Sequence, residues 1–190
     1  MIEVLARRPS TAVERPVARR GASRPRHWVP FAIVATAVLA SSPACLWVMD
    51  HTHPSAQVHV VALFFHLAAL VVGFGGVLAV DWVALLFTLG RRRLSDLLET
   101  ADTMLVPIWG GYAALVLSGL LLEPDLHSPI TQVKLALVVV IGVNGGLALW
   151  LHSHLEHGGG RAVMLVGGLC ATISQVGWWG ATLVGFINAH

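Results

Sequence analysis

The stretch VHVVALFFHLAALVVGFGGVLAVDWVALLFTLGRRR, from Val58 to Arg93, decides the fold class of this chain. An α-helix from His59 to Gly90 would be about 48 Å long, against ~30 Å of hydrocarbon in a bilayer. The stretch therefore predicts a membrane-spanning helix that stops at three arginines. Because an ionisable side chain is costly in lipid, His66 in this run needs a structural or functional reason.

The rest of the chain has the same apolar character. Of its 190 residues, 56% are hydrophobic and only 12% are charged. This composition excludes an ordinary soluble domain and predicts an all-α, polytopic bundle of five transmembrane helices. The predicted spans are residues 28–49, 59–89, 104–122, 129–151 and 162–187. Both cysteines lie in apolar runs and there is no CxxCH motif, which excludes a disulfide framework and covalently attached c-type haem.

The basic residues predict the orientation of these spans. Residues 1–27 are rich in Arg, Pro, Ala and Ser and predict a disordered basic arm. With five spans, every basic residue except Lys134 falls on one side, so the positive-inside rule places the N-terminus in the cytoplasm of a bacterial-type inner membrane. Topology accounts for the arm without nucleic acid. The small residues Ser42, Pro43 and Ala44 leave a second interpretation open, a cleaved signal peptide.

Shorter patterns predict local features. Apolar residues at helical spacing in 94–101 predict a short amphipathic helix on the membrane surface. Ser128 and Pro129 predict the start of the fourth span. The neighbouring Trp82 favours an interfacial position for Asp81. Three lone polar residues are expected to tie helices together: Ser118, Asn144 and Gln175.

Two histidines and a lysine are the candidate cofactor ligands. His59 and His66 are two turns apart on a face that also carries small residues, so this face is expected to pack against neighbouring helices. Lys134 lies six residues into the fourth block, at roughly the depth of His66. A b-type haem could use His66 as axial ligand, and Lys134 could contact a propionate. A histidine hydrogen-bonded inside the bundle and a snorkelling lysine are the structural alternatives.

A second candidate site lies in the predicted outer loops. Imidazole and carboxylate groups there suit copper, zinc or iron, and they come from His51, His53, His59, His127, Asp50, Glu123 and Asp125. The alternative is a set of solvated loops, because loops are normally polar.

Residues 59–154 resemble a known family of membrane proteins. They contain an early histidine, a glycine-rich continuation, an Arg-rich turn and the segment TQVKLALVVVIGVNG. This arrangement resembles the HemJ-type membrane protoporphyrinogen oxidases and, more loosely, the copper-resistance D-like membrane proteins. The resemblance implies a small helical bundle that binds b-type haem, with the functional histidine and lysine falling on His66 and Lys134. The family's arginine and second histidine have no match in AVDWVALLFTLG, and the first and fifth spans are additional.

Three hypotheses about function follow. The first is a membrane b-type haem or porphyrin-handling redox protein with a ligand pocket in the outer half of the bundle and a quinone as acceptor. The second is a copper-related transport or resistance protein that uses the outer histidines. The third is a non-catalytic scaffold or assembly subunit, as a homo-oligomer or in a membrane complex.

Overall fold

The protein is a bundle of five long α-helices. The computed structural model describes residues 28–156 and 160–187. The helices are α1 (Val29–His51), α2 (Ala56–Thr88), α3 (Leu94–Gly119), α4 (Pro129–Glu156) and α5 (Arg161–Ile187). All five are long and apolar enough to cross a membrane, so the predicted fold class is confirmed and the chain is a multi-pass membrane protein. The predicted arm, residues 1–27, lies outside the described residues.

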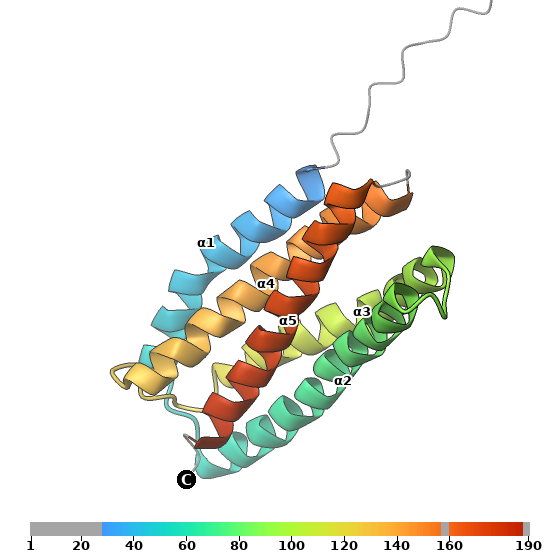
Figure 1. Cartoon of the computed structure of the whole chain (residues 1–190). Helices are drawn as coiled ribbons and strands as arrows, with labels where there is room; N and C mark the ends of the chain where they lie inside the picture. The colour runs from blue at the N-terminus through green and yellow to red at the C-terminus, as the bar shows by residue number, and fades with distance from the viewer. Residues whose placement is uncertain (1–27, 157–159, 188–190) are drawn as a thin grey trace, which may run out of the picture.

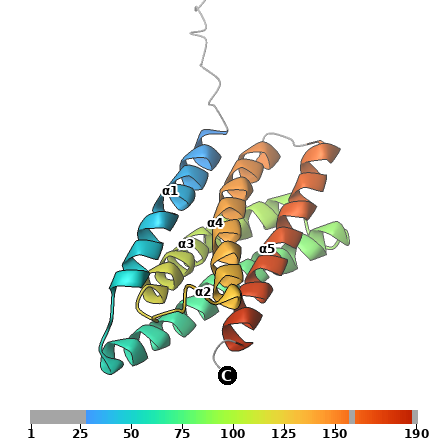
Figure 2. The same ribbon diagram turned by 90° about the vertical axis from the view of Figure 1, so that its left-hand side faces the viewer.

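The helices form two groups. One group is the antiparallel pair α2 and α3, and the other is α1, α4 and α5, in which α4 packs between its two neighbours. Figure 2 shows α2 and α3 running obliquely behind α4 and α5. The two groups touch each other over few residues.

Close backbone contact holds α2 against α3. A Cβ atom added at Gly111 would overlap the backbone of Gly73, and one added at Gly76 would come within 2.9 Å of the Ile108 side chain. Four small residues along one side of α2 are buried: Ala62, Ala69, Gly73 and Gly76. The prediction that this face of the second span packs against neighbours is therefore confirmed.

Aromatic stacking joins the two groups near the middle of the bundle. The rings of Phe74 in α2 and Trp178 in α5 stack with centroids 5.5 Å apart and an interplanar angle of 3°. Trp178 is only 3% exposed, and Ile141 of α4 is buried in the same cluster. This cluster fixes how the pair and the trio meet.

The third helix differs from the prediction. Residues 94–101 do not form a separate surface helix, because α3 continues from Leu94 through Pro107 to Gly119. The carboxylate of Asp96 accepts a hydrogen bond from the Arg93 backbone N–H at 3.2 Å, which caps the helix. Proline is tolerated inside transmembrane helices because nearby groups satisfy the freed backbone. The predicted start of α4 at Pro129 is confirmed.

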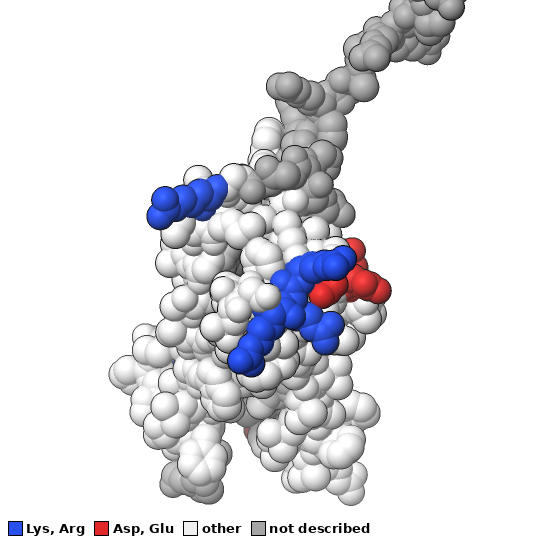
Figure 3. All heavy atoms as spheres, turned by 45° about the vertical axis from the view of Figure 1, so that its right-hand side comes forward, with Lys and Arg blue, Asp and Glu red and all other residues white. Residues whose placement is uncertain are grey.

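The two ends of the bundle differ in charge. We call the end with Arg91, Arg92, Arg93 and Arg161 the basic end, and the end with the 52–55 and 120–128 connections the loop end. In Figure 3 the visible basic side chains lie toward one end of the molecule, and none is seen at the other. Two helices, α3 and α4, separate Arg93 from Arg161, so both basic segments are expected on the same side of the membrane.

Candidate functional site

His66 is held by a hydrogen bond from its own helix to the next one. Its Nδ1 lies 3.0 Å from the hydroxyl of Ser118 in α3, and Ser118 is 8% exposed. The imidazole also faces Gly119, where an added Cβ would lie 3.6 Å from Cε1. His66 is therefore half-buried between α2 and α3 and has a defined orientation.

The Ser118 hydroxyl decides which ring nitrogen of His66 carries the proton. Its hydrogen is directed to the carbonyl of Ala114, with an O–O distance of 2.6 Å. Since the serine proton is used there, the serine oxygen accepts from Nδ1–H of His66. The neutral ring then presents the lone pair of Nε2. Histidines that bind metals are commonly held in this way by a partner on the other ring nitrogen.

Lys134 lies across the bundle on α4, next to α5. Its Nζ would be 3.6 Å from a Cβ added at Gly185. Among the described residues it makes no hydrogen bond or ion pair. A half-buried ammonium without a protein partner favours a contact with an anionic group.

The third predicted cofactor residue, His59, has a less defined setting. It is half-buried near the start of α2, and no described residue hydrogen-bonds its ring. His59 therefore lacks the positioning contact that His66 has.

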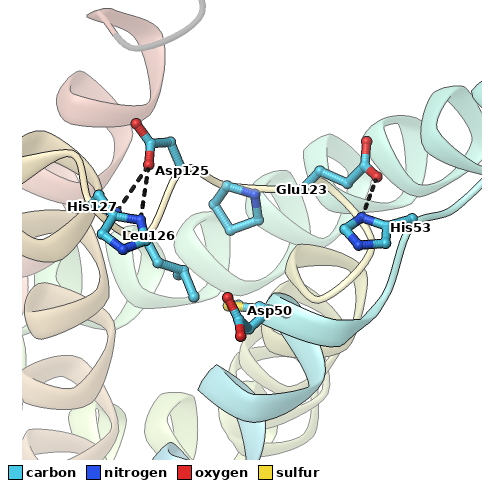
Figure 4. Close-up of a pocket in the computed structure, with 8 residues that line it drawn as sticks. Asp50, His53, Glu123, Asp125, Leu126 and His127 are labelled. Atoms are coloured by element: carbon cyan, nitrogen blue, oxygen red, sulfur yellow. Dashed lines mark hydrogen bonds and ion pairs between the residues drawn. The ribbon is translucent and has the colours of Figure 1, made fainter.

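The outer-loop histidines form three separate pairs with acids. His53 lies 3.5 Å from Glu123, His127 lies 3.8 Å from Asp125, and His51 lies 3.6 Å from Asp50. Figure 4 shows the first two pairs on opposite sides of a hollow of about 220 Å³. Across residues 28–156 and 160–187, no three His, Cys, Asp or Glu side chains are grouped closely enough to hold a metal ion. The loops are brought together, but the predicted copper ligands are not gathered into one donor set.

The three lone polar residues tie helices together, as predicted. Ser118 joins α3 to α2 through His66, and Asn144 joins α4 to α5 by donating to the Cys170 carbonyl at 3.0 Å. Gln175 joins α5 to α2 by donating to the carboxylate of Asp81.

A cavity of about 500 Å³ lies between the two helix groups. It is lined by the second halves of α2 and α4 and the first halves of α3 and α5, so it lies in the half toward the basic end. The sequence analysis expected a ligand pocket in the other half, around His66 and Lys134. Residues 94–101 supply several lining side chains, which explains their apolar face without a membrane-surface helix.

Asp81 is the residue from which this cavity could have been predicted in the sequence. The adjacent Trp82 favoured an interfacial position, but Asp81 lines the cavity while Trp82 is 61% exposed on the outside of α2. An ionisable residue within an apolar span was sufficient reason to expect a functional site there.

Comparisons with protein-family models, with curated proteins and with solved structures found no match for this chain.

Proposed function

We propose that this chain is a membrane protein that binds a b-type haem or a related porphyrin and takes part in redox chemistry. The observation that supports this proposal most is the contact between His66 Nδ1 and Ser118, which leaves Nε2 available as a ligand. Bound haem would supply one-electron chemistry. The chain's own contribution would be to hold the imidazole, to neutralise a propionate and to exclude water.

The positions of His66 and Lys134 fit this division of roles. His66 would provide the axial nitrogen from α2, and Lys134 would provide the cation from α4. His66 lies next to Gly119 of α3 and Lys134 next to Gly185 of α5, where no Cβ crowds either side chain. The resemblance to the HemJ-type proteins supports the same two residues.

The copper hypothesis is less well supported. Its ligands His51, His53 and His127 are each paired with a different carboxylate, and the described residues offer no three-donor group. The scaffold hypothesis predicts that His66 is a packing residue only. We further propose that the basic end faces the cytoplasm of a bacterial-type inner membrane.

An absorption spectrum tests the haem proposal. Protein purified in detergent from haem-replete cells is expected to show a Soret band that is lost in His66→Ala and retained in His59→Ala. His59→Ala is the matched control because it removes an imidazole from the same face of α2. A colourless wild-type protein, or equal bands in all three proteins, would reject the proposal.

A further inference from the structure

The cavity between the two helix groups has the size and the lining of a binding site for a small molecule. Its volume of about 500 Å³ lies within the ~300–1,000 Å³ range of ligand sites. Most lining side chains are aliphatic, and Trp109, Tyr112 and Trp178 add aromatic surface. The cavity lies within the membrane-spanning part of four helices, so its ligand must be lipophilic.

Asp81 on α2 is the first of the polar side chains that line this cavity. Gln175 donates to Oδ2 of Asp81, and Trp179 donates to the side-chain oxygen of Gln175 at 3.0 Å. The amide of Gln175 is thereby oriented with its nitrogen toward the carboxylate. No described residue donates to Oδ1 of Asp81, which therefore remains an acceptor at the cavity wall.

Asn144 on α4, which also lines the cavity, carries a second unpaired acceptor. Asn144 is 7% exposed, and its Nδ2 donates to the carbonyl of Cys170 at 3.0 Å. The amide orientation is fixed, because reversing it would place two oxygens against each other. Its Oδ1 is buried without a hydrogen-bond partner among the described residues. A buried unsatisfied oxygen costs about 1–3 kcal/mol, so this wall favours a ligand with a hydrogen-bond donor.

The charge of the wall narrows the ligand class further. Within residues 28–156 and 160–187, no Lys or Arg side chain lines the cavity, and the histidine that does, His152, lies 3.3 Å from Asp102 on α3. Asp81 and Asn144 both line this cavity, so the two acceptors belong to one site. Aromatic faces such as that of Trp178 also attract cations.

We propose that this cavity binds a lipophilic organic ammonium ion, with Asp81 as its counter-ion, Asn144 as a second acceptor and the aromatic side chains around its apolar part. The site lies in the other half of the bundle from His66 and does not depend on haem binding. A neutral hydroxyl compound of the same shape could donate hydrogen bonds but would lack the charge.

A pair of fluorescent probes can test the proposal. The probes are 1-pyrenebutylamine and 1-pyrenebutanol, which differ only in ammonium against hydroxyl. Full-length protein is placed in nanodiscs of zwitterionic lipid, and binding is measured by energy transfer from tryptophan to pyrene. The ammonium probe is expected to bind about tenfold or more tightly than the alcohol, because a partly buried opposite charge contributes that much.

Variants locate the binding. Asp81→Asn is expected to lower the affinity for the ammonium probe about tenfold and to leave that for the alcohol unchanged. Glu99→Gln removes the same charge from an exposed position at the same end of the bundle, outside the cavity lining, and is expected to change neither affinity. Ala84→Trp fills part of the cavity and is expected to abolish saturable binding of both probes.

Three results would overturn the proposal. Equal affinity for both probes would show a site for neutral lipophilic molecules. Binding that survives Ala84→Trp would show partition into lipid. An unchanged ammonium affinity in Asp81→Asn would exclude the counter-ion. Thermal unfolding of each variant identifies loss of fold, and if Asp81→Asn does not fold, the comparison of probes on wild type and Ala84→Trp still decides.

Discussion

Replacing Ser118 by alanine should weaken haem binding without removing the ligand. Outside its own helix Ser118 hydrogen-bonds to His66, through the 3.0 Å contact to Nδ1, and its side chain is buried. Without the hydroxyl, Nδ1–H loses its acceptor, and the ring is free to rotate or to change tautomer. An unsatisfied buried donor costs about 1–3 kcal/mol, and loss of such a supporting contact typically lowers metal affinity about 10–100-fold. The energy and the change in affinity agree, because a tenfold change in affinity corresponds to about 1.4 kcal/mol.

The assay is a titration of haem-free protein with haemin in detergent, followed by the Soret band. Ser42→Ala is the matched control, since the Ser42 hydroxyl also donates to a carbonyl four residues earlier, Val38, at 2.7 Å but does not contact His66. Ser118→Ala should raise the dissociation constant about 10–100-fold, and Ser42→Ala should leave it unchanged. If Ser118→Ala binds haemin as tightly as wild type while His66→Ala does not bind it, the proposed positioning by Ser118 is wrong.

Three further predictions follow from the same geometry. Gly111→Ala should lower the free energy of unfolding by about 1–3 kcal/mol, because the new Cβ overlaps the backbone of α2. Gly110→Ala is the control and should leave the free energy of unfolding unchanged, because an added Cβ there has nothing within 4 Å. Thermal unfolding in detergent compares the two variants, and equal stability would refute the close contact. Lys134→Met should weaken haemin binding about tenfold, because the proposed contact with a propionate is lost. It should also raise the unfolding temperature of the haem-free protein, because a half-buried ammonium is removed. A lower unfolding temperature would show that Lys134 has a stabilising partner within the protein. Asp125→Cys should react with a membrane-impermeant maleimide on intact cells, whereas Arg92→Cys should react only after the cells are permeabilised. The reverse pattern would show that the proposed topology is inverted.

The fold was predictable because membrane helices are set by local composition. Each apolar run had to form a helix, because a helix satisfies its backbone hydrogen bonds internally, and each run was long enough to span the bilayer. The inward face of α2 followed from the small residues around Gly73, since such residues mark close helix contacts in membranes. The link from Ser118 to another helix followed from the tendency of polar side chains in membrane helices to hydrogen-bond across helices, although its partner, His66, could not be named.

The arrangement of the helices was less predictable. Lipid-facing and helix-facing positions are both apolar, so periodicity does not show which helices are neighbours. The two groups meet at the stacked rings of Phe74 and Trp178, and the cavity beside Asp81 lies between the groups. That contact joins residues far apart in the sequence. Among the described residues the outer histidines pair with separate carboxylates, because loop proximity does not bring His53 and His127 to one point.

The most direct test of the haem proposal is chemical rescue of the ligand. His66→Gly removes the imidazole but leaves Ser118 and Gly119 around the vacated space. The variant should be purified without a Soret band and should regain the wild-type band when haemin and free imidazole are added together. A wild-type band in His66→Gly without imidazole would show that His66 is not the ligand.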